Sequence, residues 1–457
     1  MRASSIIFVA TACASLGAGR ATGSAVASEP PVPANSTSSA PIGPTTLSPT
    51  ESRLRDHVRT HHQDDVTLLE MAVNISSGTQ NVAGVRRVGD LFASELAAMG
   101  FAVRWADMPA ALHRADHLVA ERRGTRGARL LLIGHLDTVF DGDGQRFVRD
   151  DSIARGAGTS DMKGGDVAMI AALRALNANG ALDGSQIIVV MTGDEESAGS
   201  PLEDARRDLI DAARRSDVAL AFEGGRAARA SIARRGSSSW TLEVTAPQGH
   251  SAGVFTSGYG AVYEMARILD SFRQELAGDP TLTFNPGLAA GGTTVRRDSS
   301  STALAAAGKT NIISPTAIVQ GDLRFLRESQ KDSARTRMRA IVAQHLPGTD
   351  AEIHFRDSYP AMPPTAAGAE LLAKFDAVSR SLGYGLVEGD PPESRGAGDV
   401  SFVAPFVAGM DGLGVSGRGA HSPEESVNLN SLTMAGERAA VIMYRLITGP
   451  TLERPRS

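Results

Sequence analysis

The strongest constraint on the fold is a set of short apolar runs, each of which leads directly into an acidic residue or a histidine. The first run, residues 130–133 (LLLI), carries no charge and continues through Gly134 to His135 and Asp137. A run of this kind predicts a strand that is buried on both faces of a sheet. Side chains two residues apart on a strand point the same way, so we expect His135 and Asp137 on one side of the chain.

Further strands and helices follow in alternation. We predict strands at residues 186–192 and 218–222, and helices at residues 85–99, 166–177, 202–215, 366–382 and about 432–446. Strands that alternate with helices form parallel sheets that are covered on both faces. The prediction is therefore an α/β domain with a mostly parallel central sheet and helices on both of its faces.

The pattern changes near Gly236, where residues 240–245 alternate like a half-buried strand. Predicted elements then follow in the order βαββαβ, with helices at 259–276 and 329–345, strands within 312–325, and a strand at 352–355. This order predicts an inserted α+β sandwich of the ferredoxin-like type at residues 236–356. A chain of 457 residues is too long for one ordinary core, and the first domain would comprise residues 51–235 and 357–457.

The N-terminal region is expected to lie outside the folded domains. Residues 1–27 have the pattern of a secretory signal peptide, with Arg2, an apolar stretch at 6–16 and a small-x-small site that ends at Ala27. The apolar stretch is too short to span a membrane, so we expect cleavage, no membrane span in the mature chain, and a periplasmic or secreted protein. Lipid attachment at Cys13 is the alternative, but the usual leucine before it is missing. Residues 28–50 are rich in Pro, Ser and Thr and predict a disordered linker.

The composition excludes several classes of function. Hydrophobic residues make up 42% of the chain and charged residues 21%, as in soluble globular proteins. The net charge of −5 argues against a nucleic-acid-binding surface. Cys13 is the one cysteine and lies in the predicted signal peptide, so the mature chain would have no disulfide, cysteine nucleophile or thiolate ligand. A metal site in this chain must then use nitrogen and oxygen ligands.

Acidic residues gather at what should be one rim of the predicted sheet. His135 and Asp137, Glu195 and Glu196, and Glu223 follow three predicted strands. Asp161 lies in the loop between two of these strands, and His421 comes far downstream. An isolated acidic pair is usually the first turn of a helix. Acids that share one rim, however, repel each other by kilocalories at low dielectric. No run of lysine or arginine accompanies them, so a metal cluster is the simplest explanation.

Two histidines and three carboxylates suit a pair of divalent ions. Each ion would be held by one histidine and one terminal carboxylate, with an aspartate shared between the two. Two acids then remain for other tasks. Asp137 is placed to orient His135, and one glutamate of the tandem Glu195–Glu196 can act on a water molecule.

These motifs resemble a known family. The motifs are His135-x-Asp137, the GTSDMKGG around Asp161, the tandem Glu195–Glu196, the EGG at Glu223 and the late His421. Together they look like the dizinc metallopeptidase family of acetylornithine deacetylase, succinyl-diaminopimelate desuccinylase, aminoacylase and glutamate carboxypeptidase. The resemblance covers roughly residues 51–450 and is nearest to the secreted glutamate carboxypeptidase branch.

The resemblance implies a role for each residue. His135, Asp161 and Glu223 would hold one Zn²⁺ ion, and Glu196, His421 and the shared Asp161 the second, with Co²⁺ or Mn²⁺ as substitutes. Asp137 would support His135, and Glu195 would be the general base. The family also implies a cis peptide bond between Asp161 and Met162.

The inserted domain resembles the family's dimerisation lid, so a homodimer is expected. The QGHSAG motif places His250 where relatives send a histidine into the partner subunit's site to stabilise the oxyanion. KTNIISP places Asn311 and GDLRF places Arg324 at substrate-contact positions, although a strand-surface arginine explains Arg324 almost equally well. In SGRGAH, the backbone of Gly417 and the guanidinium of Arg418 would meet a substrate carboxylate.

The resulting prediction is a zinc-dependent carboxypeptidase that cleaves the C-terminal amide bond of a small peptide. An N-acyl-amino-acid amidohydrolase is the alternative within the same class. A non-catalytic binding protein would be expected to lack a ligand or the base, and all seven positions are filled. A serine hydrolase is disfavoured because the one Gly-x-Ser-x-Gly match, at residues 249–253, lies in the inserted domain. Histidines that match no motif are expected at the surface or at helix ends: His113, His117, His345 and His354.

Overall fold

The computed structural model describes residues 46–142, 145–298 and 303–450. The predicted signal peptide and residues 28–45 of the predicted linker lie outside these ranges. Helix α1 (Pro49–Thr60) begins before the predicted end of that linker at residue 50. The cause is a capping box: the backbone N–H of Glu51 donates to Ser48 Oγ at 3.3 Å, and the backbone N–H of Ser48 donates to the Glu51 carboxylate at 2.7 Å.

The central sheet has six strands and is mixed. In their spatial order they are β1 (Ala102–Ala106), β2 (His117–Arg122), β6 (Ser185–Thr192), β3 (Arg126–His135), β7 (Val218–Ala221) and β18 (Ala408–Met410). The strands β6, β3, β7 and β18 pair in parallel, whereas β2 is antiparallel to both of its neighbours. The prediction of a mostly parallel sheet is therefore wrong. The segment between β1 and β2 contains only the short 3₁₀ helix η1 (Ala110–Leu112), so no crossover helix returns the chain to start β2 in the parallel direction.

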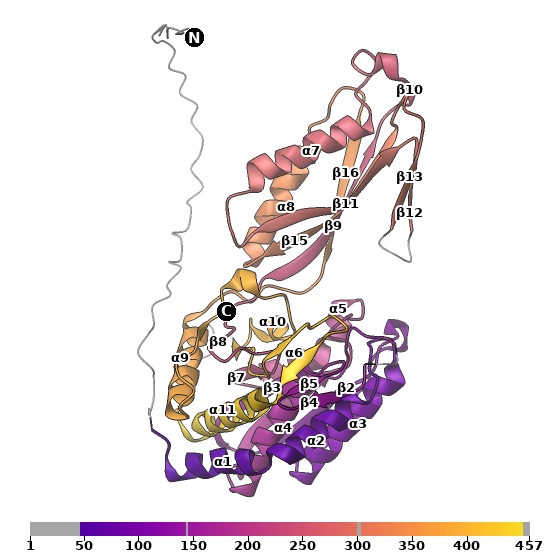
Figure 1. Ribbon diagram of the computed structural model, residues 1–457. Helices are drawn as coiled ribbons and strands as arrows, with labels where there is room; N and C mark the ends of the chain where they lie inside the picture. The colour runs from indigo at the N-terminus through magenta and orange to yellow at the C-terminus, as the bar shows by residue number, and fades with distance from the viewer. Residues whose placement is uncertain (1–45, 143–144, 299–302, 451–457) are drawn as a thin grey trace, which may run out of the picture. The chain divides into compact units, whose positions relative to one another are not determined.

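Helices cover both faces of this sheet, as the sequence predicted. Alternate residues of β3 enter two different cores, Leu130 and Leu132 on one face and Leu131 and Ile133 on the other. The first face packs against α1, α2 (His62–Val73), α3 (Val82–Ala98), α4 (Lys163–Ala178), α9 (Ala366–Ser381) and α11 (Leu429–Thr448). Figure 1 shows α4 and α11 side by side beneath the sheet. The second face packs against α6 (Arg207–Arg214) and α10 (Val400–Val403).

Most predicted elements of this domain are present with their ends shifted by a few residues. The exception is the helix predicted at 202–215, which is interrupted at Arg206 and forms α5 (Leu202–Ala205) and α6. Two small sheets complete the domain. One has the order β19 (Gly417–Arg418), β20 (Ser426–Asn428), β5 (Ile153–Arg155) and β4 (Val148–Asp150), and the other pairs β8 (Arg229–Ala230) with β17 (Glu388–Gly389), beside η3 (Pro392–Ser394).

Residues 236–357, which we call the lid segment, form a second sheet with its own core. Its strands β11 (Thr283–Gly292), β15 (Thr316–Phe325), β9 (Gly236–Thr245) and β16 (Asp350–Asp357) lie in that order and are all antiparallel. Helices α7 (Ala261–Leu276) and α8 (Glu328–Val342) pack on one face around Trp240, Leu242 and Val319. The element order is the predicted βαββαβ, but the two middle strands are β11 and β15, whereas both were predicted within residues 312–325.

Short strands are added to the lid segment. Strands β12 (Thr294–Arg297) and β13 (Leu304–Ala307) form a hairpin. Strand β10 (Gly249–His250) pairs with β14 (Ile312–Ile313), and the 3₁₀ helix η2 (Ser251–Gly253) comes directly after β10. None of the helices in the described part of the chain has the length and apolar character needed to cross a membrane.

Candidate active site

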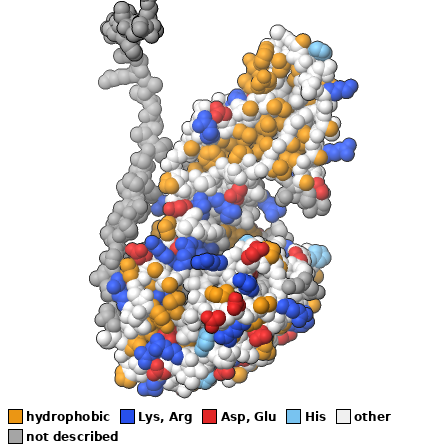
Figure 2. Space-filling view, viewed as in Figure 1, with side chains coloured by type: hydrophobic (Ala, Val, Ile, Leu, Met, Phe, Trp, Pro, Cys, Tyr) orange, Lys and Arg blue, Asp and Glu red, His pale blue; other side chains and the backbone are white. Residues whose placement is uncertain are grey.

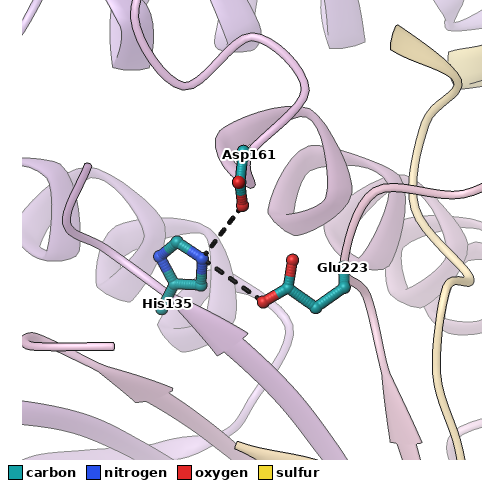
Figure 3. Close-up of side chains that lie close together, drawn as sticks. All are labelled: His135, Asp161 and Glu223. Atoms are coloured by element: carbon teal, nitrogen blue, oxygen red, sulfur yellow. Dashed lines mark ion pairs between the residues drawn. The ribbon is translucent and has the colours of Figure 1, made fainter. Parts of the chain in front are cut away.

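His135 stands at the end of β3 and faces two carboxylates that come from other parts of the chain. Its Nε2 atom lies 3.4 Å from Asp161 Oδ1 and 3.4 Å from Glu223 Oε1, as Figure 3 shows. Asp161 precedes α4, and Glu223 follows β7. Because β3 and β7 are parallel neighbours, their carboxyl ends bring His135 and Glu223 to the same edge of the sheet.

A second group shares Asp161 with the first. The Nε2 atom of His421 lies 3.2 Å from Asp161 Oδ2 and 3.2 Å from Glu196 Oε2. Asp161 therefore presents one oxygen to each histidine. The structure thus brings together five predicted metal ligands in two overlapping sets of three.

The geometry of both sets fits metal ions. Tetrahedral ligands at roughly 2.0–2.1 Å from a Zn²⁺ ion lie roughly 3.3 Å from each other, which is close to the 3.2 and 3.4 Å observed. Among the described residues, the buried atoms His135 Nε2 and Glu196 Oε1 have no hydrogen-bond partner. Polar atoms are rarely buried without a partner. Imidazole and carboxylate donors suit divalent ions.

The pKa values of the two histidines indicate that this edge of the sheet needs positive charge. Burial lowers the pKa of His135, but contacts with Asp137, Asp161 and Glu223 outweigh this and raise it well above its usual value. Contacts with Asp161 and Glu196 raise the pKa of His421 to about 10. Burial opposes the fall in the pKa of Asp161, yet the two imidazoles hold it below its usual value. A divalent ion in each set would replace the protons that the imidazoles otherwise take up.

The pKa values of the three glutamates at this edge are raised, whereas that of Asp161 is lowered. Burial raises the pKa of Glu195 well above its usual value, and the charges of Glu223 and Glu196 add to the shift. Burial also raises the pKa values of Glu196 and Glu223, and in both cases the charge of Asp161 contributes. Carboxylates held this close together stay ionised only beside a positive charge.

Asp137 connects His135 to the tandem glutamates. Its carboxylate is fully buried and accepts hydrogen bonds from the backbone N–H groups of Glu195, at 3.0 Å, and Glu196, at 3.1 Å, and from Thr79 Oγ1 at 2.6 Å. The Nδ1 atom of His135 lies 3.1 Å from the backbone oxygen of Asp137, which accepts its hydrogen and leaves Nε2 directed at Asp161 and Glu223. This arrangement fixes the orientation of a ligating imidazole.

Glu425 was not singled out from the sequence, but it shapes the loop that carries Asp161. Its buried carboxylate accepts from the backbone N–H groups of Gly158 at 2.8 Å, Ser160 at 2.7 Å and Asp161 at 3.0 Å. It lies four residues after His421, so the same loop supplies one predicted ligand and the anchor for the loop of another, Asp161. The peptide bond between Asp161 and Met162 is cis, as the resemblance implied.

A second set of residues that was not predicted lies behind Glu195. Arg206 is fully buried and donates to Asp399 Oδ1 at 2.6 Å, to Asp194 Oδ1 at 2.6 Å and to the hydroxyl of Tyr359 at 2.9 Å. The Tyr359 hydroxyl in turn donates to the backbone oxygen of Glu195 at 2.6 Å. The sequence signal for this set was the charge of Arg206 inside the helix predicted at residues 202–215.

The expectation that His117 lies at the surface or at a helix end is wrong. His117 is 1% exposed, since it begins the interior strand β2. Its Nε2 donates to the backbone oxygen of Ala205 at 2.8 Å, and its Nδ1 accepts from the backbone N–H of Gly193 at 3.0 Å. His117 therefore supports the turn that leads into Glu195.

Within the described residues, no hydrogen bond or ion pair joins the proposed substrate-contact residues of the lid segment to the predicted metal ligands. His250 is exposed, and its Nδ1 accepts from the backbone N–H of Ala252 at 3.2 Å. Asn311 lies nearby, because its backbone oxygen accepts from Ser251 at 3.0 Å. Arg324 is paired with Asp322 at 2.8 Å near the other end of β15.

Gly417 packs beside the loop that carries the predicted ligand Asp161, and Arg418 follows it in the chain. Both are in β19, where Gly417 packs so tightly on Ser160 that an added Cβ would come within 2.2 Å of the Ser160 Cβ. Only glycine fits there. Arg418 is exposed in the same strand, on the chain that leads to His421.

Comparison with known proteins decides the family. A model described as Peptidase family M20/M25/M40 matches residues 131–447. The chain belongs to this family. Membership makes it a metal-dependent hydrolase and confirms the resemblance seen in the motifs.

Individual members of the M20/M25/M40 family show how far the likeness extends. Carboxypeptidase G2 of Pseudomonas sp. is 27% identical over 397 residues, which are 84% of this chain and 89% of that protein. A succinyl-diaminopimelate desuccinylase of Alkalilimnicola ehrlichii is 27% identical over 349 residues, 71% of this chain and 86% of that protein. The crystal structure of aminopeptidase PepT from Bacillus cereus superposes with a TM-score of 0.67 at 17% identity, covering 84% of this chain and 98% of that one, which shows the shared fold.

The role of Glu425 as anchor of the Asp161 loop can be tested with Glu425→Gln. The amide would turn an N–H₂ group toward backbone N–H donors, so the loop should lose its shape and metal affinity should fall about 10–100-fold. Equilibrium dialysis against Zn²⁺ measures this. Glu424→Gln, at the exposed neighbouring position, is the control and should bind like wild type. Wild-type affinity in Glu425→Gln would contradict the role.

Tyr359→Phe tests the contact behind Glu195. It removes the hydroxyl that donates to Glu195 and accepts from Arg206. We expect kcat to fall about 10–100-fold through misplacement of Glu195, with KM and metal content nearly unchanged. Tyr384→Phe, which removes a comparable hydroxyl bonded to Glu437, is the control for general destabilisation. An equal loss of kcat in both variants would show that the contact has no specific effect.

Proposed function

We propose that the protein is a carboxypeptidase with two Zn²⁺ ions that releases the C-terminal residue of a small peptide. The observation that carries the proposal is the position of Asp161, whose two oxygens each face one histidine, at 3.4 Å from His135 and 3.2 Å from His421. A carboxylate shared in this way suits two ions a few ångströms apart. The likeness to carboxypeptidase G2 supports this choice of bond.

Two bound divalent ions would lower the pKa of a water molecule and polarise the carbonyl of the amide to be cleaved. The chain's own residues would handle the protons. Glu195 takes a proton from the attacking water and then delivers it to the nitrogen of the leaving amine. Burial raises the pKa of Glu195, which makes its carboxylate a stronger base near neutral pH.

The remaining predicted residues would hold the substrate. The backbone of Gly417 and the guanidinium of Arg418 meet the C-terminal carboxylate, because both lie in β19 on the way to His421. Asn311 and Arg324 provide further polar contacts from the lid segment. His250 would stabilise the oxyanion in the partner's site, since it is exposed and near Asn311.

An N-acyl-amino-acid amidohydrolase is the second candidate. The desuccinylases among the relatives favour it, because their names describe removal of an acyl group. Both reactions cleave an amide next to an amino-acid carboxylate, so the same five ligands and the same base would serve either.

Glu195→Gln tests the reaction and its base. The variant should retain metal, since Glu195 is outside both ligand sets, and turnover should fall about 10²–10⁴-fold because the proton acceptor is lost. Dipeptides, folate-type glutamyl conjugates and N-acetyl amino acids form the substrate panel. Chelation should abolish turnover of wild type, and Zn²⁺, Co²⁺ or Mn²⁺ should restore it. Near-normal turnover in Glu195→Gln would refute its role, and a preference for N-acetyl amino acids would favour the second candidate.

We also propose a homodimer formed through the lid segment. Phe255 is 67% exposed and Tyr263 is 51% exposed, and their ring centroids are 5.9 Å apart. Figure 2 shows hydrophobic side chains gathered on this face of the lid segment. Exposed apolar patches of this kind often mark protein interfaces.

The double variant Phe255→Ser with Tyr263→Ser should shift the protein toward monomers in multi-angle light scattering, because it removes the apolar contact. Met71→Ser is the control, since Met71 is equally exposed at 51% but lies in α2. An unchanged dimer fraction, or a monomeric wild type, would rule out this interface.

We further propose export to the periplasm or the medium, based on the signal-like pattern of residues 1–27. Intact mass of the protein recovered from the periplasm and the medium should show loss of these residues. Recovery of the uncleaved chain in the cytoplasm alone would contradict the proposal.

A further inference from the structure

The lid sheet has one face that no helix covers. Trp240, Leu242 and Val244 of β9 point into the core with α7 and α8, so Ser239 and Thr241 point to the other face. The strand register extends this polar face across the sheet. One row contains Arg356, Ser239, Asp322 and Asn285, and the next contains His354, Thr241, Gln320 and Leu288.

The hairpin β12–β13 lies beside β11, as Figure 1 shows, and its residues Arg297, Ala303 and Leu304 line a hollow on this face. The sheet and the hairpin enclose a trough of about 1050 Å³. We call it the lid trough, and the residues that matter for its chemistry are Arg297, Leu304, Gln320, Asp322, His354 and Arg356. The volume suits a short peptide or another ligand of that size.

The charge of the lid trough is positive, in a chain whose net charge is −5. Arg297 and Arg356 are exposed, and no ion pair or side-chain hydrogen bond joins either of them to another described residue. Asp322 is the one acid in the described lining, and Arg324 Nε already donates to both of its oxygens at 3.0 and 2.8 Å. Two arginines are therefore available to bind anions, and a guanidinium binds a carboxylate through two parallel hydrogen bonds.

The side chain of Gln320 needs a hydrogen-bond donor from the ligand. Its Oε1 atom is buried and has no hydrogen-bond partner among the described residues. A carbonyl oxygen in that position needs a donor. A peptide chain supplies both groups, carboxylates for the arginines and backbone N–H groups for Gln320.

The same lining disfavours a nucleic acid. Single strands are held by aromatic side chains on which bases stack. Trp240, the largest aromatic residue of the lining, is 2% exposed and directed into the core. Carboxylates on an extended peptide match the lining better than phosphates between stacked bases.

We propose that the lid trough binds an acidic peptide chain, with carboxylates at Arg297 and Arg356 and a backbone N–H donated to Gln320 Oε1. All of these residues belong to the lid segment. Binding therefore does not depend on the metal ligands, and it goes beyond the proposed reaction by giving the protein a second site that selects acidic peptides.

The test uses the full chain with Glu195→Gln as background, so that a peptide is not consumed. Fluorescence anisotropy with labelled, C-terminally amidated hexaglutamate gives the Kd, and the corresponding hexaglutamine peptide reports binding without charge. Arg297→Gln with Arg356→Gln should weaken hexaglutamate binding about ten-fold or more through loss of two charge-assisted contacts. Gln320→Leu should weaken both peptides. Arg296→Gln is the matched control, because Arg296 is exposed in the same hairpin but does not line the trough.

The expected result is hexaglutamate binding that exceeds hexaglutamine binding about ten-fold or more, with the loss confined to the trough variants. Failure of hexaglutamate to bind, equal affinity for the two peptides, or an equal loss in Arg296→Gln would overturn the proposal. An oligonucleotide that displaces hexaglutamate at lower concentration would also overturn it. A change of oligomeric state in the trough double variant, without peptide binding, would assign the face to a second copy of the chain instead.

Discussion

Crowding of negative charge at one edge of the central sheet is the constraint on which the rest of the structure depends. Asp161, Glu196 and Glu223 face two histidines at 3.2–3.4 Å, and the charges of Glu196 and Glu223 also act on Glu195. Burial raises the pKa values of all three glutamates. Such an arrangement holds only if the backbone fixes the acids in place and cations offset their repulsion. The buried carboxylates of Asp137 and Glu425 fix the backbone, since Asp137 accepts from the N–H of Glu196 and Glu425 accepts from the N–H of Asp161.

The sequence predicts those residues of this edge that directly follow the strands of the central sheet. The uncharged runs at 130–133, 186–192 and 218–222 identify strands without ambiguity, and the parallel pairing of β6, β3 and β7 then places His135, Glu196 and Glu223 at one edge. Asp161 and His421 differ, because they stand in loops held by the short sheet of β19, β20, β5 and β4. Strands of two or three residues are too short to show an alternation of apolar and polar residues in the sequence. Both were candidates because of their loops, but only the resemblance to the family assigned each of them to a particular ion.

The errors in the predictions have a common physical origin. Strands β1 and β2 mix polar and apolar residues, so no buried strand was predicted there and the antiparallel pairing went unseen. Arg206 and Asp399 are 193 positions apart in sequence and meet in the core, and the partners of Glu425 lie more than 260 positions away. A buried charge looks like a surface charge until its partner is located, because its solvation comes from tertiary contacts. Sequence reading therefore recovers the ligands more readily than the residues that hold them.

The contacts behind Glu195, the proposed base, connect it to the segment that follows the lid segment. Tyr359 lies two residues after the end of β16. Its hydroxyl donates to the backbone oxygen of Glu195 and accepts from Arg206. Arg206 is fully buried and has acidic partners on two further segments, so it cannot follow a displaced tyrosine without leaving a buried charge unpaired. Any shift of the lid segment at its C-terminal connection must then either carry Glu195 with it or break the 2.6 Å bond between Tyr359 and Glu195. The position of Glu195 is in this way tied to the position of the lid segment.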